Sequence, residues 1–154
     1  MKMRLALLTV LVLSLSAAAA CGGDSDASVE EYRDQANDVC RDVERQLDEI
    51  QRTLPATAEQ AEKQAEAVID VSEQALDNLR QVDAPEEVQG TYDRYLSERE
   101  AAIEFIEQAR DAAADKDSGA YEQAKRRLAA GQPTRRQLAL KAGLSACSRP
   151  SVPE

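Results

Sequence analysis

Apolar side chains recur every three or four residues along most of the chain, which is the spacing of amphipathic helices. The first such run precedes Pro55 and consists of Val29, Tyr32, Ala36, Val39, Val43, Leu47, Ile50 and Leu54. Ser28 stands before it with Glu31 three residues further on, the pattern of a capping box, and Pro55 ends a helix or forces a turn. The pattern predicts a first helix between Ser28 and Pro55.

Two more stripes follow at the same spacing. A second helix is predicted to start near Thr57, with Gln60 three residues on, and carries Ala61, Ala65, Val68, Ser72, Ala75, Leu76 and Leu79 on one side. Pro85 suits the start of a third helix, and the acids Glu86 and Glu87 suit the positive end of its dipole. This third stripe consists of Val88, Tyr92, Tyr95, Leu96, Ile103, Ile106, Ala109 and Ala113.

A fourth helix is predicted after a turn at residues 115–119, with an apolar side formed by Tyr121, Ala124, Leu128, Leu138 and Ala142. Pro133 interrupts it, so we expect this helix to be kinked or split near that residue. Gly143 followed by Leu144 indicates a C-terminal cap. No segment alternates with a period of two, and the connections are short. The chain therefore predicts an all-α, up-down-up-down four-helix bundle.

The N-terminus has the order of a secretory signal peptide: Lys2 and Arg4, an apolar run over residues 5–15, then small residues over 16–20. Its last residues, Ala18-Ala19-Ala20-Cys21, resemble the lipobox of bacterial lipoproteins, in which the cysteine is diacylated and becomes the new N-terminus. The alternative is ordinary cleavage that leaves Cys21 as a thiol. We predict a signal peptide over 1–20, a lipid-anchored tether over 21–27, a bundle over 28–147 and a tail over 148–154.

Cysteine counting favours lipidation of Cys21, because Cys40 and Cys147 then remain as an even pair in an oxidising compartment. The predicted topology places the start of the first helix and the end of the fourth at the same end of the bundle, so the two cysteines can meet. A redox or metal-binding pair is the rival interpretation. It lacks support, since the chain has neither a CxxC motif nor any histidine. We expect a Cys40–Cys147 disulfide.

Composition argues against several classes of function. The chain has 29 acidic and 19 basic residues, and removal of the leader changes the formal charge from −10 to −12. Such a surface repels nucleic acid. The absence of histidine removes the commonest general base and metal ligand. Asp115, Asp117 and Gly119 faintly resemble a calcium loop, but their spacing is wrong and a turn is favoured. We predict a non-enzymatic protein without a cofactor or metal.

Charge is segregated along the chain. Residues 120–154 have seven basic and two acidic side chains (+5), whereas residues 21–119 have 10 basic and 27 acidic ones (−17). One interpretation is that a basic fourth helix packs between acidic neighbours and relieves their repulsion. The other is contact with anionic headgroups, at about 1 kcal/mol for each residue near the surface. The residues expected to make that contact are Arg135, Arg136, Lys141 and Arg149.

Taken together, the lipobox, Cys40 in the first helix, Pro85 at a helix start and Gly143-Leu144 before Cys147 resemble the small helical lipoproteins of actinobacteria. The resemblance implies an anchored extracytoplasmic domain and supplies no catalytic residues. Our leading hypothesis is a binding or interaction module that presents its membrane-distal loops at 53–57 and 115–119. The alternative is a transporter-associated or regulatory lipoprotein that binds a small ligand between helices. The partner and the oligomeric state stay open.

Overall fold

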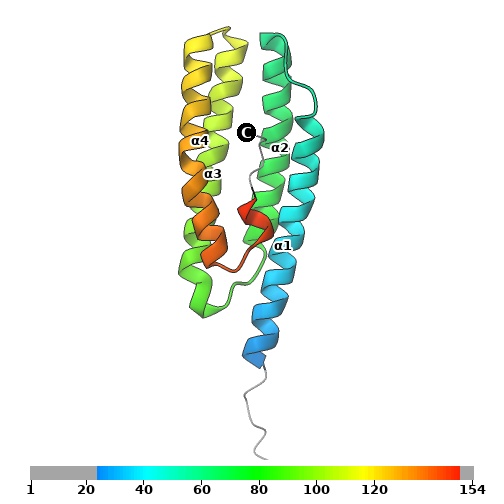
Figure 1. The fold of residues 1–154 in the computed structure, drawn as a ribbon, viewed down its shortest axis with the longest axis vertical. Helices are drawn as coiled ribbons and strands as arrows, with labels where there is room; N and C mark the ends of the chain where they lie inside the picture. Colours follow the sequence, from blue (N-terminus) through cyan, green and yellow to red (C-terminus); the bar gives the residue numbers. More distant parts are fainter. Residues whose placement is uncertain (1–23, 150–154) are drawn as a thin grey trace, which may run out of the picture.

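The computed structural model describes residues 24–149, with side chains from Ser28 onward. Four helices follow one another in antiparallel order, α1 (Asp24–Ile50), α2 (Ala58–Arg80), α3 (Glu86–Ala114) and α4 (Ser118–Lys141), and a short 3-10 helix, η1 (Ala146–Ser148), comes after them (Figure 1). The described part of the chain contains no strand. The predicted all-α four-helix bundle is confirmed.

The start of α1 differs from the prediction. The helix begins at Asp24, so Ser28 lies inside it and does not cap it. Two aspartates in the first three helical positions explain the earlier start, because acids stabilise the positive end of the helix dipole. As a result the first turns of α1 extend beyond the lower end of the bundle (Figure 1). The predicted signal peptide, Cys21 and residues 150–154 lie outside the described residues.

The predicted starts of α2 and α4 are confirmed by their caps. The Thr57 hydroxyl accepts a hydrogen bond from the amide of Gln60 at 3.2 Å, and the Gln60 side chain in turn accepts one from the Ala56 amide at 2.8 Å. Asp117 caps α4, since its carboxylate accepts a hydrogen bond from the Ala120 amide at 3.0 Å. Side chains thus satisfy amides that the first turn of each helix leaves without an intrahelical partner.

α4 ends at the predicted glycine cap. Gly143 has a φ of 79°, in the left-handed region that disfavours side chains. The amide of Leu144 donates to the carbonyl of Ala139 at 2.8 Å, and the amide of Gly143 donates to that of Leu140 at 3.1 Å, which together form a Schellman motif. Leu144 is fully buried. The cap therefore turns the chain into the core and towards η1.

The sequence predicted that α4 is either kinked or split near Pro133. It is not split, because a single helix runs through this residue. Pro133 is exposed, so the backbone bonds that the proline loosens face solvent. A nearby side chain adds support, since the Arg135 guanidinium reaches back two turns and donates to the carbonyl of Leu128 at 2.9 Å. Gly131 leaves room for it, because a Cβ there would lie 2.5 Å from an Arg135 nitrogen.

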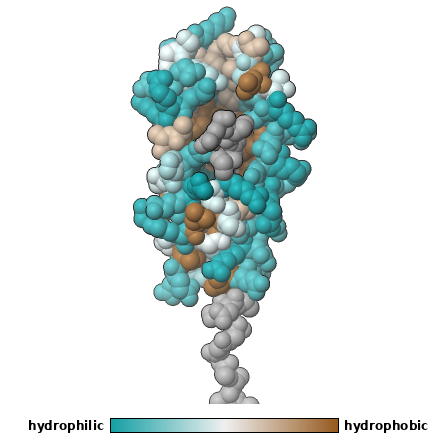
Figure 2. Space-filling view, in the orientation of Figure 1, coloured by the Kyte–Doolittle hydropathy of each residue, from teal (hydrophilic) through white to brown (hydrophobic). Residues whose placement is uncertain are grey.

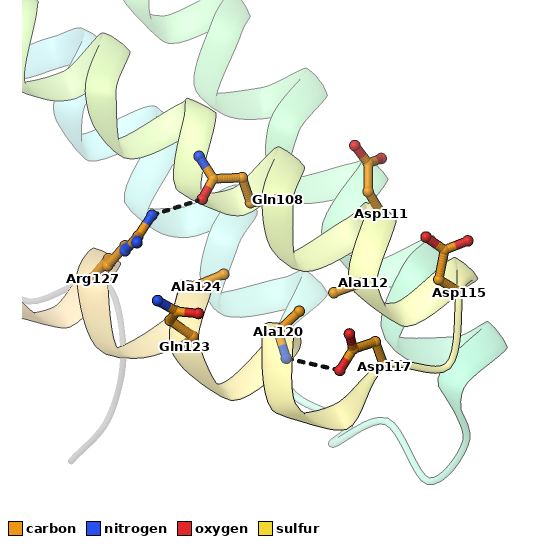
Figure 3. A pocket seen from close by; sticks show the side chains of 9 residues that line it. All are labelled: Gln108, Asp111, Ala112, Asp115, Asp117, Ala120, Gln123, Ala124 and Arg127. Atoms are coloured by element: carbon orange, nitrogen blue, oxygen red, sulfur yellow. Dashed lines mark hydrogen bonds between the residues drawn. The ribbon is translucent and has the colours of Figure 1, made fainter.

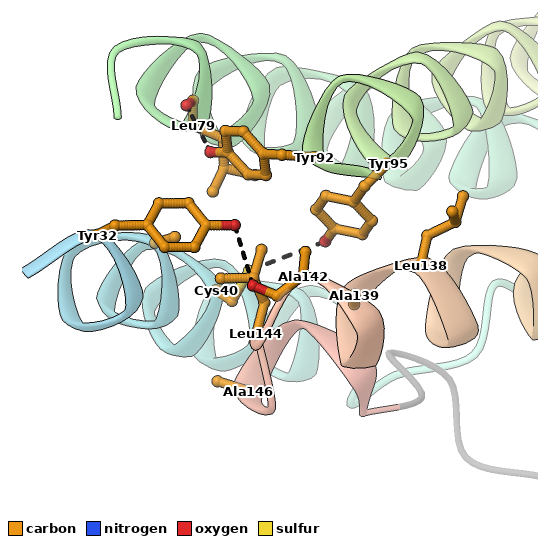
Figure 4. Close-up of a cluster of buried hydrophobic side chains, with 11 residues drawn as sticks. Tyr32, Cys40, Leu79, Tyr92, Tyr95, Leu138, Ala139, Ala142, Leu144 and Ala146 are labelled. Carbon is orange, nitrogen blue, oxygen red and sulfur yellow. Dashed lines mark hydrogen bonds between the residues drawn. The ribbon is translucent and has the colours of Figure 1, made fainter. Parts of the chain in front are cut away.

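The largest apolar cluster lies in the lower half of the bundle and joins all four helices and η1 (Figure 4). Smaller clusters pack α1 against α2 around Val43 and Leu47, and α2 against α3 around Ile69, Leu76 and Ile103. η1 contacts both α1 and α4, whereas no Cα of described α1 comes within 8 Å of one in α4. The ring of helices is thus closed by η1 and not by α1 packing on α4.

Candidate functional site

A pocket of about 300 Å³ opens between α3 and α4 beside the turn that joins them (Figure 3). Small side chains at Ala112, Ala120 and Ala124 leave the space between the two helices. Around it stand polar side chains, and the complete lining consists of Gln108, Asp111, Ala112, Asp115, Asp117, Ala120, Gln123, Ala124 and Arg127. Three carboxylates against one guanidinium make this pocket acidic.

The turn that places two of the carboxylates is set by the backbone. Lys116 has a φ of 58°, the one positive value outside glycine in the described chain. The amide of Asp117 donates to the carbonyl of Ala112 at 2.8 Å, and the amide of Lys116 donates to that of Ala113 at 3.0 Å. This is a second Schellman motif, with lysine where glycine is usual. It reverses the chain within three residues and keeps Asp115 and Asp117 at the same edge of the pocket.

The polar side chains differ in how far they are already engaged. Asp111 pairs with Arg110, its neighbour on α3, at 2.8 Å, and Asp117 is the cap of α4. Arg127 donates to the Gln108 side chain across the pocket at 3.5 Å (Figure 3). The carboxylate of Asp115 has no hydrogen bond or ion pair with any described residue. Asp115 is therefore the group most available to an incoming cation.

Residues 115–119 were predicted as a presented loop, and Asp115 and Asp117 lie at the pocket. Asp111 was not predicted, although it precedes Asp115 by four residues and so shares its helix face. Gln123 and Arg127 were missed as well, because their approach depends on how α4 is aligned with α3. The other predicted loop, at 53–57, lies at the same end of the bundle (Figure 1). Its Leu54 is 86% exposed.

The four basic residues predicted to touch a membrane fall into two pairs. Arg149 pairs with Glu44 of α1 at 3.3 Å, and Arg135 is half-buried and bonded to its own helix. Arg136 and Lys141 are exposed and make no ion pair with any described residue. Two of the four, Arg136 and Lys141, are thus exposed and have no ion pair with a described residue, as contact with lipid headgroups requires.

The other interpretation of the charge pattern was that a basic fourth helix packs between acidic neighbours. In the described residues, the cations of α4 form no ion pairs with the acids of those neighbours. The helix contains six basic residues and one acid, and it packs on α3, which has eight acids and three basic residues. Within the described residues, the ion pair formed by an α4 cation is the one between Lys125 and Glu122 of the same helix, at 3.4 Å. The attraction between α3 and α4 is therefore general and not fixed in salt bridges.

Cys40 and Cys147 form the predicted disulfide, with a Cα–Cα distance of 5.0 Å. Tyr32, Tyr92 and Tyr95 pack around it, and each is at most 2% exposed (Figure 4). Tyr32 donates to the carbonyl of Ala142 at 3.1 Å. Burial raises the pKa of Tyr32 to about 12 and raises that of Tyr92 further above its usual value. Tyr32 and Tyr92 stay neutral at physiological pH and donate hydrogen bonds to backbone carbonyls of other helical segments, Ala142 and Leu79.

Metal-binding clusters and membrane-spanning helices are both absent from the described residues. Within residues 24–149 there is no group of three or more acidic or cysteine side chains placed to hold a metal ion. None of the helices described is both long and apolar enough to span a bilayer. No protein-family model matches the chain, and no match was found among curated proteins or solved structures.

Proposed function

We propose that this protein is an extracytoplasmic lipoprotein, held at the cell membrane by lipid on Cys21, and that it acts as a non-enzymatic binding module. The lipobox pattern supports the anchor. The disulfide supports the compartment, because such bonds persist where the surroundings are oxidising. Only two residues separate Cys21 from the start of α1 at Asp24, so the bundle would stand close above the lipid.

An anchor at this position fixes which end of the bundle a partner meets. α1 has 27 residues and is about 40 Å long at 1.5 Å per residue. The turn between α1 and α2 and the turn between α3 and α4 lie at the far end from Asp24 (Figure 1). The acidic pocket beside the second turn is the observation that carries the proposal, because it combines a concave shape with unpaired charge where a partner has access.

The chemistry of the pocket favours a cationic group, an amine or a guanidinium. Asp115 would pair with it, while Gln108 and Gln123 offer amide oxygens. The volume of about 300 Å³ is at the lower limit for small-molecule sites. The same pocket therefore also serves the alternative function, binding of a small ligand between helices by a transporter-associated or regulatory lipoprotein. In both cases the bound group is a cation.

Binding of spermidine and of a tri-arginine peptide, measured by calorimetry on the purified full chain, tests the pocket. Asp111→Asn together with Asp115→Asn should weaken binding at least tenfold. The control Asp70→Asn removes an equally exposed carboxylate from α2 and should leave binding unchanged. Asp117 is kept, because it caps α4. Equal weakening by the control would mean general attraction to an acidic surface and would refute the site.

The anchor has its own test. Mass spectrometry of the mature N-terminus should find a diacylated Cys21, and Cys21→Ser should release the protein from the membrane fraction. A cleaved chain with an unmodified Cys21 would contradict the anchored location. It would leave the pocket proposal standing, since the two rest on different residues.

A contact between the bundle and the membrane surface is proposed for Arg136 and Lys141. Leu140 between them is 53% exposed, and an apolar side chain flanked by cations suits an anionic interface. The contact requires the bundle to tilt, because in an upright bundle these residues would lie about 12 Å above Asp24, the rise of α1 to the level of Tyr32, which is beyond the ~8 Å over which surface charge acts. Replacing both cations with glutamine should weaken binding to anionic vesicles, whereas Arg126→Gln with Arg127→Gln should not.

A further inference from the structure

One side of the bundle is not closed by packing of its helices. α1 and α4 stay apart, and η1 lies between them in the lower half of the molecule (Figure 1). Towards the distal end, beyond η1, the described residues place no element between these two helices. We call this part the α1–α4 seam, and Figure 2 views the molecule from the same side.

The chain leaves η1 in the direction of the seam. Cys147 is joined to Cys40, and Arg149 pairs with Glu44, which lies one helical turn further along α1. Since α1 runs from the anchored end to the distal end, two successive contacts place the chain on a distal course before residue 150. Residues 150–154, Pro-Ser-Val-Pro-Glu, follow Arg149 directly in the sequence.

Two arginines from the neighbouring helices α3 and α4 are half-buried near this seam. Arg99 of α3 donates to the hydroxyl of Tyr95 at 3.0 Å, and this hydroxyl lies 3.9 Å from the sulfur of Cys40 on α1. Arg135 of α4 donates to the backbone carbonyl of Leu128. Both partners are neutral, and no described carboxylate lies within ion-pair distance of either guanidinium. Partial burial without a counterion is unfavourable for a charge.

The electrostatics of Arg135 agree with this placement. Burial lowers its pKa, and the charge of Arg99 lowers it further, so the two guanidinium groups lie near enough to repel each other. Glu98 acts in the opposite direction, but it is a weaker influence and forms no ion pair with Arg135. A carboxylate placed between the two arginines would relieve both the burial cost and the repulsion.

The C-terminal segment has the length, charge and stiffness to supply it. Five residues in an extended, proline-rich conformation span about 15 Å. The Arg99 guanidinium is within that reach, because Tyr95 links it to Cys40 beside the origin of the segment. The Arg135 guanidinium extends up α4 towards the distal end, because it bonds to the carbonyl of Leu128, seven residues earlier in the helix. The segment contains one acid, Glu154, and no cation.

We propose that residues 150–154 dock in the α1–α4 seam and that the Glu154 carboxylate pairs with Arg99 and Arg135. Val152 would cover apolar side chains of the seam, and the two prolines reduce the number of backbone amides left without partners. The segment then completes the bundle on the side where α4 and α1 do not meet. This inference is independent of the acidic pocket, which lies between α3 and α4 beside the turn that joins them and shares no residue with the seam arginines.

Hydrogen–deuterium exchange of the full chain, purified in detergent, tests the docking through the amides of Ser151, Val152 and Glu154. In the unmodified protein these amides should exchange at least tenfold more slowly than in an unstructured peptide of the same sequence. Glu154→Gln, Arg99→Gln and Arg135→Gln should each restore the fast rate. The matched control Arg136→Gln removes an exposed cation one residue away and should keep the slow rate.

Each result decides the question. Fast exchange in the unmodified protein would overturn the docking, and slow exchange that survives loss of both arginines would overturn the pairing. Protection that rises with protein concentration would assign the seam to a second copy of the chain, which also contradicts the proposal. Because Glu154 lies outside all helices described, Glu154→Gln remains informative even if an arginine variant fails to fold.

Discussion

Removal of the Cys40–Cys147 disulfide should bring the protein close to unfolding. The bond joins residues 107 positions apart, so in its absence the unfolded chain regains the entropy of a very long loop. On the chain-entropy model, closure of such a loop is equivalent to about 4.8 kcal/mol at 25 °C. Small domains have a total unfolding free energy of about 5–15 kcal/mol. One bond therefore accounts for a large share of the stability.

The perturbation is Cys40→Ser with Cys147→Ser, which keeps two small side chains and leaves Cys21 unchanged. A loss of 4.8 kcal/mol, spread over the unfolding entropy of a folded part of about 126 residues, lowers the melting temperature by roughly 18 °C. Urea denaturation followed by circular dichroism at 222 nm gives the free energy directly. The unmodified protein with a reducing agent should reproduce the variant.

A matched comparison separates chain entropy from packing. Tyr95→Phe removes the hydroxyl near the Cys40 sulfur and keeps the bond, so it should cost about 1 kcal/mol. If the double serine variant loses less than this, with unchanged helix content, the reasoning is refuted. That result would mean that other contacts stabilise the reduced protein enough to make the disulfide unnecessary.

Three further predictions concern local features. Gly143→Ala should lower the free energy of unfolding by about 1–2 kcal/mol, because its φ is 79° and the new Cβ would lie 2.7 Å from the Arg33 side chain. Lys116→Gly, at the equivalent cap of α3, should raise the free energy of unfolding by about 0.5–1 kcal/mol, because glycine adopts a positive φ without strain. Urea denaturation measures both changes. Asn37→Ala should cost about 2–3 kcal/mol in the same assay, since the side chain accepts from the first amide of η1 at 2.8 Å and loss of it leaves that amide buried and unpaired. Burial raises the pKa of Tyr32 to about 12 in the folded state, so its neutral phenol stabilises the fold fully below pH 10. As the pH rises from 10 to 12, the free energy of unfolding should fall by about 3 kcal/mol on account of this residue. Tyr32→Phe should flatten this part of the plot of stability against pH. An unchanged alkaline slope in that variant would contradict the assignment.

The sequence predicts the helices and most of their ends because these depend on neighbouring residues. Thr57, Asp117 and Gly143 act through hydrogen bonds that span three to five residues, so their patterns are local. The start of α1 was wrong because two kinds of local signal compete there, a capping box at Ser28 and acids from Asp24 onward. Periodicity cannot decide between them, since both lie before the first buried side chain.

The candidate site could be predicted only in part, because it depends on the alignment of two helices. Asp115 and Asp117 lie in a turn that composition identifies, but Gln123 and Arg127 enter the pocket from α4 at positions that no local pattern marks. The role of Arg135 was likewise hidden. It depends on Gly131 being small and on the Leu128 carbonyl lying within reach of the guanidinium, and both follow from the three-dimensional path of the helix.

The structure also separates stability from recognition along the bundle axis. The disulfide, the three tyrosines and the Gly143 cap all lie in the half near Asp24, where large side chains are buried. Towards the other end, the buried α4 residue beside α3 is Ala124, and no bulky side chain fills the space that forms the pocket. A protein anchored at Cys21, as proposed above, can tolerate this, because the disulfide and the tyrosine contacts hold the helices together at the base while the tip stays open to a ligand. Filling the tip, for example by Ala124→Leu, should therefore increase stability and abolish binding of cations together, which an exposed acidic patch without a pocket would not do.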